Sequence, residues 1–160
     1  MIVLAIDPGI EGAWAFHYER GLPPYMDDLP IMGAKTSRQI NAAQLAEDWR
    51  SLIRANGKPA AAIVEDVHAM PKQGVRSVWT FAEGHGAVLG ALGAMAIPVH
   101  LVAPSAWKKA AGLGRDKGAS RQRAMELWPS MATSFARVKD DGRAEAALIA
   151  LHGWRQGQGS

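Results

Sequence analysis

The chain contains no cysteine among its 160 residues. This absence excludes disulfide bonds, thiolate catalysis and zinc sites built on cysteine. Apolar runs long enough to span a membrane are also missing, because the longest weakly polar stretch, residues 86–102, is interrupted by glycines, a proline and a histidine. No basic segment precedes the apolar N-terminus and no small-residue cleavage site follows it, so we expect no signal peptide, no membrane contact and a cytoplasmic location.

Hydrophobic residues make up 48% of the sequence, which is enough for a packed core and argues against a disordered chain. The length fits one domain. The sequence contains neither an internal repeat nor an interdomain linker. We therefore predict a single domain over residues 1–155, followed by a loose tail at 156–160.

Acidic residues are scarce in residues 108–139, where only Asp116 and Glu126 stand among many basic residues. The basic residues are Lys108, Lys109, Arg115, Lys117, Arg121, Arg123, Arg137 and Lys139. A segment of this kind can bind phosphates. A charge run alone more often means a solvated helical face, but the carboxylates described below favour a nucleic-acid partner.

Hydrophobic periodicity predicts alternating strands and helices after three opening strands. The strands are expected at 1–6, 13–18, 25–31, 60–65 and 97–102. The helices are expected from a cap at Ser37 or Asn41 to Asn56, and at 77–95, 104–111, 120–128 and 141–154. This order predicts an α/β fold of the ribonuclease H-like type, with a central mixed five-stranded sheet flanked by helices.

Acidic residues occur where two of these strands end. Asp7 follows the apolar run 1–6, and Glu65 follows the run 60–64. The carboxyl ends of such strands form the usual mouth of an α/β sheet. Asp141 and Glu145 lie four residues apart on the last predicted helix, so they share one face. Carboxylates brought together from three segments predict a site for hard cations, at which two metals could cut a phosphodiester bond.

Each acid also has a simpler explanation when taken alone. Asp7 could form a turn before Pro8, Asp141 could cap a helix, and Glu145 could be a surface residue. Their joint occurrence weakens these explanations. Asp66 is expected on the opposite face of its strand, in a structural role.

Lysines and one loop complete the candidate nucleic-acid surface. Lys108 or Lys109, together with Lys117, could stabilise charge that develops on a phosphate, or simply anchor DNA. The loop 68–74 follows the strand that carries Glu65 and could wedge between bases of distorted DNA. We expect Trp49, Trp79 and Trp128 to be packing residues. The expected DNA contacts are His68, Met70, Lys72, Gln73, Lys109, Arg115 and Arg121.

Five ordered segments of the chain resemble the RuvC-type Holliday junction resolvases. They are Ile6-Asp7-Pro8-Gly9, Ile63 to His68, Gly84-His85-Gly86 with Leu89-Gly90, Val102 to Lys108, and Asp141 to Ala150. The resemblance covers nearly the whole chain and is closest to the phage, bacterial and chloroplast branch. It implies a ribonuclease H-like nuclease that works in DNA recombination and repair as a homodimer. Each subunit would nick one of two opposed strands of a four-way junction, with Mg²⁺ or Mn²⁺ as cofactor and water as nucleophile.

The resemblance also implies roles for particular residues. Asp7, Glu65, Asp141 and Glu145 would bind the metal, while Lys108 and Lys117 would lie near the scissile phosphate. One departure concerns the last helix, where the best-known RuvC pattern has two aspartates three residues apart. Here Asp141 precedes Glu145 by four residues, a spacing similar to that of the chloroplast branch, and Asp140 competes with Asp141 as the ligand.

Other functions stay open on the sequence alone. The same fold could cut general branched DNA or RNA–DNA hybrids, or could bind junctions without cutting them. Phosphate-binding ATPases of the actin type also end their first strand in Asp and Gly, but they need two such halves, and this chain is too short for them. The sequence does not reveal the preferred cleavage sequence, a phage or chromosomal origin, or whether a branch-migration motor is a partner.

Overall fold

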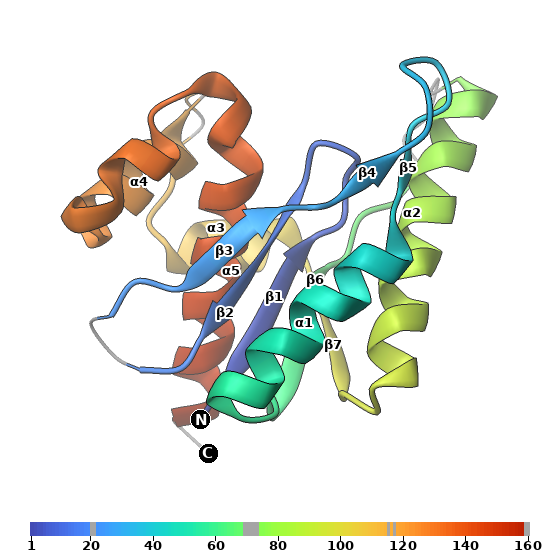
Figure 1. Ribbon diagram of the computed structural model, residues 1–160. Helices are drawn as coiled ribbons and strands as arrows, with labels where there is room; N and C mark the ends of the chain where they lie inside the picture. Colours follow the sequence, from blue (N-terminus) through green and yellow to red (C-terminus); the bar gives the residue numbers. More distant parts are fainter. Residues whose placement is uncertain (20–21, 69–73, 115, 117, 159–160) are drawn as a thin grey trace.

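The computed structural model of the chain describes residues 1–19, 22–68, 74–114, 116 and 118–158. Helices cover both faces of a central sheet (Figure 1). Within the described ranges, no helix is both long and apolar enough to cross a membrane.

Five strands form one mixed sheet, as the sequence predicts. They are β1 (Val3–Asp7), β2 (Ala13–His17), β3 (Tyr25–Asp28), β6 (Ala61–Glu65) and β7 (Val99–Val102), in the spatial order β3-β2-β1-β6-β7. The first three strands pair antiparallel, whereas β6 runs parallel to β1, and β7 parallel to β6. Ile6 pairs with Val64. Asp7 and Glu65, the next residues, therefore lie side by side at the carboxyl ends of β1 and β6.

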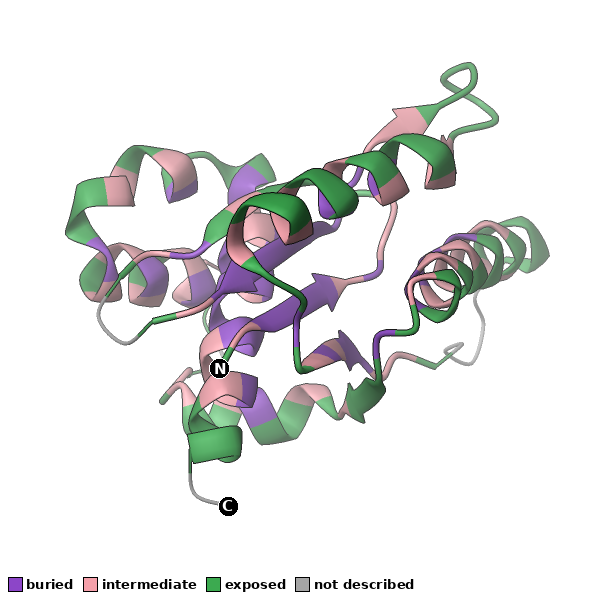
Figure 2. Ribbon diagram, turned by 60° about the horizontal axis from the view of Figure 1, so that its bottom comes forward, coloured by how far each residue is buried: buried purple, intermediate pink, exposed green. Residues whose placement is uncertain are grey.

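Side chains of the central strands alternate between two cores, one on each face of the sheet. Leu4 and Ile6 pack with α1 (Ala42–Asn56) and α2 (Val75–Ala94). Ala5 faces the opposite core, built on α5 (Asp141–Gln158). The smaller helices α3 (Pro104–Ala110), α4 (Ala119–Leu127), η1 (Pro129–Phe135) and η2 (Val138–Asp140) complete the fold. Both cores follow from the two-residue repeat of a strand buried on both faces, and the buried strands lie at the centre of Figure 2.

Local sequence explains the bounds of α1. The side chain of Asn41 accepts a hydrogen bond from the backbone N–H of Gln44 at 3.1 Å, which satisfies a free donor of the first turn. Gly57 ends the helix with a φ of +100°, a conformation that glycine adopts without strain. Of the two predicted caps, Ser37 and Asn41, the structure selects Asn41, and the predicted end at Asn56 is confirmed.

Small residues let α5 approach the sheet closely. A Cβ atom on Gly142 would lie 2.6 Å from the backbone oxygen of Glu11, and one on Gly153 would lie 2.4 Å from the Ile63 side chain. Ala144 and Ala147 are fully buried between these two glycines. The backbone of α5 thus lies against β1 and β2. This packing brings the first turns of α5 to the carboxyl end of β1, where Asp7 lies.

The structure differs from the sequence prediction at the end of the third strand and at the start of the last one. The third strand ends at Asp28 instead of residue 31, and a two-stranded ribbon follows, formed by β4 (Ile31–Met32) and β5 (Gln39–Ile40). Pro30 accounts for the break, because it has no N–H to donate to a ladder. The last strand begins at Val99, just after Pro98.

The predicted loose tail at 156–160 is wrong for residues 156–158, which form the last turn of α5. Gly157 lies against Met1 in this turn, where an added Cβ atom would meet the methionine sulfur at 2.6 Å. The helix therefore continues past the predicted end at Trp154. Residues 159–160 lie outside the described ranges.

Candidate active site

Two elements bring three acidic side chains to one open cleft of about 930 Å³. Asp7 comes from β1, while Asp141 and Glu145 come from the first turns of α5. Lys108 of α3 and Arg121 of α4 supply positive charge to the same cleft. The sequence prediction that separated segments deliver carboxylates to one place therefore agrees with the geometry for these three acids.

Asp7 ends β1 at a tight turn, and its carboxylate accepts from the backbone N–H of Gly9 at 3.5 Å. Gly12 closes the turn, because a Cβ atom there would lie 2.1 Å from the backbone oxygen of Asp7. Burial raises the pKa of Asp7 to about 7, and repulsion from Glu145 and then Glu65 adds to this increase. The three carboxylates thus destabilise one another's charge, as expected of a site that attracts a cation.

Glu65 is buried at the end of β6, where 6% of the residue is exposed. The indole N–H of the fully buried Trp107 donates to its Oε1 at 2.9 Å. Burial raises the pKa of Glu65, and this hydrogen bond opposes the increase. Glu65 is therefore held in one orientation beside Asp7.

Glu145 is half-buried and has two partners on the walls of the cleft. The hydroxyl of Ser120 donates to its Oε1 at 3.2 Å, and the Lys108 ammonium lies 3.5 Å from the same oxygen. Lys108 also lies 5.0 Å from the centroid of the Trp107 ring. The helix α3 thus connects Glu65 to Glu145 through two consecutive residues.

The structure distinguishes Asp141 from its competitor Asp140. Asp140 is buried, with 1% of the residue exposed, and pairs with Arg137 at 2.8 Å. This pairing holds the pKa of Asp140 below its usual value. Asp141 lines the cleft instead and accepts from Nε of Arg121 at 2.6 Å. Asp141 is therefore the aspartate of this pair that lines the cleft.

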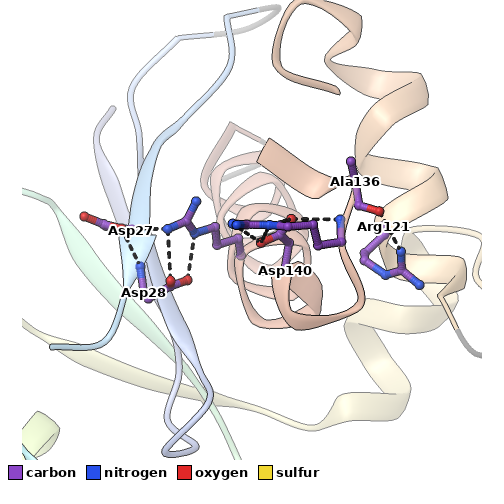
Figure 3. Close-up of polar contacts among 7 residues, drawn as sticks. Asp27, Asp28, Arg121, Ala136 and Asp140 are labelled. Carbon is purple, nitrogen blue, oxygen red and sulfur yellow. Dashed lines mark hydrogen bonds and ion pairs between the residues drawn. The ribbon is translucent and has the colours of Figure 1, made fainter. Parts of the chain in front are cut away.

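Ion pairs around the start of α5 fix its position. Arg143 donates to Asp27 at 3.0 Å and to Asp28 at 2.7 Å, which ties α5 to β3. Figure 3 shows Asp27 and Asp28 on one side of the helix, and Arg121 with Ala136 on the other. These contacts restrain the helix that carries Asp141 and Glu145.

The donor set suits a hard divalent cation, because oxygen atoms of carboxylates are the preferred ligands of Mg²⁺. Repulsion among Asp7, Glu65 and Glu145 also favours such an ion. As they stand, however, no three His, Asp or Glu side chains of the described chain are arranged to ligate one ion. Asp141 is engaged by Arg121 and Glu65 by Trp107, so ligation would require side-chain rearrangement.

The remaining predicted site residues are exposed or lie outside the described ranges. Lys109 is exposed on α3, and His68 is exposed with its Nε2 3.5 Å from Asp66. The predicted positions Met70, Lys72, Gln73, Arg115 and Lys117 fall outside the described residues.

The three tryptophans expected to be packing residues divide into two groups. Trp49 and Trp128 are buried, as predicted. The prediction is wrong for Trp79, which is 71% exposed on the outer side of α2.

Sequence reasoning did not assign a function to Trp107 or Ser120. Trp107 immediately precedes Lys108, so its position was visible, but nothing in the sequence pairs it with Glu65, 42 positions earlier. Ser120 lies in the basic segment and faces Glu145 only because α4 packs on α5. Contacts across such distances depend on the fold and leave no local pattern.

Solved structures resemble the whole chain. RuvC of Thermus thermophilus in complex with a Holliday junction substrate has a TM-score of 0.59 and 18% sequence identity, over 94% of this chain and 91% of that one. A further Thermus thermophilus RuvC structure has a TM-score of 0.57 and 20% identity, over 98% and 97%. No protein-family model and no curated protein matches the sequence. At these identities the likeness establishes the fold, which is the ribonuclease H-like α/β fold of RuvC.

Proposed function

We propose that the protein is a metal-dependent endonuclease that resolves four-way DNA junctions by paired symmetric nicks. The observation that carries the proposal is the convergence of Asp7, Glu65 and Glu145, whose mutual repulsion helps to raise the pKa of Asp7 to about 7. The cleft beside them has Lys108 and Arg121 on its walls. The likeness to RuvC with a Holliday junction substrate supports the choice of branched DNA.

Each side chain has a distinct role in this proposal. Asp7, Glu65, Asp141 and Glu145 would hold Mg²⁺, with Mn²⁺ as a substitute. The metal would act as a Lewis acid on the phosphate and make water a stronger nucleophile. Lys108 would place its ammonium beside the phosphate that is cut, and Lys117 is proposed for a similar role. The hydrogen bond from Trp107 keeps Glu65 oriented towards this centre.

The DNA surface is proposed to extend from the cleft over Lys109 of α3 and Arg121 of α4. The loop 68–74, with His68, is proposed to contact the branch point. These contacts would be made mainly with phosphates, so binding should weaken steeply as salt is raised.

Paired incision implies two active sites, and we propose that α2 forms the interface of a homodimer. Gly86, Gly90 and Gly93 face open space on its outer side, where an added Cβ atom would meet nothing within 4 Å. Glycine within a helix costs about 1 kcal/mol relative to alanine. A partner helix that approaches closely would explain why glycines recur on this face, and a two-fold dimer would match a four-way junction.

The direct test is cleavage of a synthetic mobile four-way junction with Mg²⁺, Mn²⁺ or a chelator, by wild type and Asp7→Asn. We expect symmetric nicks that require metal and disappear in the variant. Equal cutting of linear duplex would instead identify a general nuclease, and cutting of RNA–DNA hybrid would identify a hybrid nuclease of the same fold.

A catalytically inactive junction-binding protein is the second candidate. It is favoured by one observation, that Asp141 is occupied by Arg121 and the acids of the described chain do not form a ready set of three ligands. Tight junction binding without cleavage under any metal would support this candidate and contradict the first.

A further inference from the structure

Arg121 occupies an unusual place in the cleft, because its guanidinium contacts a proposed metal ligand and faces the space proposed for DNA. Its Nε donates to Oδ1 of Asp141 at 2.6 Å. Its NH1 donates to the carbonyl oxygen of Ala136 at 3.4 Å (Figure 3). Its side chain is only 18% exposed. The guanidinium is therefore well ordered by protein groups, unlike a mobile surface arginine.

The backbone is shaped to admit this guanidinium. Gly118 precedes α4 with a φ of +85°, and a Cβ atom there would lie 2.7 Å from NH2 of Arg121. Glycine both tolerates this conformation and leaves the space that the guanidinium fills. The guanidinium that pairs with Asp141 thus lies directly against the glycine that precedes α4.

The same pairing opposes metal binding by Asp141. A carboxylate that accepts a short hydrogen bond from a guanidinium can ligate a divalent cation only if two positive groups come close together, and their repulsion is strong in a partly buried site. Arg121 engages Asp141 in the free protein, whereas Glu145 and Glu65 act on the charge of Asp7.

We propose that Arg121 is a positioning residue that holds Asp141 away from the other three carboxylates in the free protein and releases it when a DNA phosphate takes the guanidinium. Arginine suits this exchange, because its planar fork binds carboxylate and phosphate with similar geometry. The inference rests on the proposed function and makes assembly of the full ligand set depend on DNA.

The test measures Mn²⁺ binding to the protein without DNA, by electron paramagnetic resonance of free Mn²⁺. Arg121→Gln should bind Mn²⁺ more tightly than wild type, on the order of 10-fold, the scale typical of changes next to metal ligands. Asp141→Asn should bind like wild type, and the double variant should bind like Asp141→Asn. This cycle isolates the coupling between the two residues.

Arg123→Gln is the matched control, because it removes the same charge from the same helix. Arg123 pairs with Glu126 at 3.1 Å and lies away from the cleft, so its loss should leave Mn²⁺ affinity unchanged. Arg121→Lys, which keeps the charge but not the fork, should lie between wild type and Arg121→Gln. If circular dichroism shows that Arg121→Gln does not fold, Mn²⁺ affinity is compared between Arg121→Lys and wild type instead.

Junction binding in chelator gives a second readout that does not depend on metal. Arg121→Gln should bind a four-way junction more weakly and reduce the slope of log affinity against log salt by about 0.9, the value for one lost phosphate contact. Arg123→Gln should do neither.

Two results separate this inference from the proposed function. Unchanged or weaker Mn²⁺ affinity in Arg121→Gln would overturn the role of Arg121 even if wild type cuts junctions. Failure of wild type to cut any junction would overturn the proposed function, while the Mn²⁺ cycle would still decide how Arg121 acts on Asp141.

Discussion

The helices α5 and α2 are both rich in glycine and alanine, but they use these residues in opposite ways. In α5 the small residues face inward, and a Cβ atom on Gly142 would lie 2.6 Å from the backbone of the β1–β2 turn. In α2 only Gly84 faces the protein, 3.0 Å from Ile40 by the same measure, whereas Gly86 and Gly90 face open space. The same composition therefore serves close packing within the chain in one helix and leaves an unpartnered face in the other.

This difference assigns the two helices distinct roles in the proposed function. Close packing of α5 brings Glu145 near enough to Asp7 to raise its pKa. The outward glycines of α2 stabilise nothing within the chain, which is why we propose a second copy as their partner. One helix would then build each active site, and the other would pair two of them.

The largest effect should come from filling the space beneath α5. Gly142→Ala places a methyl group against rigid backbone, so we expect it to destabilise the protein by about 1–3 kcal/mol, as overpacking does. Because the carboxylates of α5 would shift, junction cleavage should fall by on the order of 100-fold. Urea unfolding and cleavage rates measure both effects. Gly86→Ala, on the open face of α2, is the control that should keep stability or gain up to about 1 kcal/mol from better helix propensity, and wild-type values in Gly142→Ala would refute the packing argument.

The next effect concerns the outer face of α2. Gly90→Arg is expected to abolish the dimer, because a long charged side chain would enter the proposed interface. The monomer should lose no stability and could gain up to about 1 kcal/mol from better helix propensity. Light scattering after gel filtration gives the oligomeric state. A wild type that is monomeric both alone and on junction DNA would count against paired incision.

A moderate effect should follow from the burial of Asp7 and from the repulsion that Glu145 and Glu65 add to it. The pKa of Asp7 is 3.8 in the reference state and about 7 in the folded protein, so the folded state binds more protons between these values. Stability contributed by this group should therefore decline as pH rises from about 4 to 7 and stay low above that. Asp7→Asn should raise the melting temperature at pH 8 in chelator, and Mg²⁺ should reduce the difference by stabilising wild type. An equal or lower melting temperature in the variant would contradict this.

The smallest effect lies at the far end of α5. His17 is buried and packs edge-on against Trp154, with ring centroids 5.5 Å apart. Burial and the nearby Arg155 lower the pKa of His17 to about 4. The unfolded state therefore binds more protons between pH 6.5 and 4, and stability should fall as pH drops through this window. Replacing His17 with Phe should flatten that part of the melting profile, and an unchanged slope would show that His17 does not cause it.

The positions of the acidic residues were predictable from sequence, because they depend on local patterns. Strand ends at Asp7 and Glu65 and the single turn that separates Asp141 from Glu145 follow from periodicity alone. Which glycines face the protein and which face open space was not predictable. This property depends on the elements that pack against each helix, and these are not visible in the local sequence. The exposure of Trp79 and the contact of Trp107 with Glu65 depend on tertiary packing in the same way.

The most direct test of the account is a crystal structure with Mn²⁺, whose anomalous signal locates the ion. We predict a peak within about 2.2 Å of carboxylate oxygens from Asp7 and at least one of Glu65 and Glu145, the distance expected of a small hard cation. The peak should be absent in Asp7→Asn. A peak at other acidic residues, or none in the wild type at saturating Mn²⁺, would contradict the claim that β1, β6 and α5 build a metal-dependent active site.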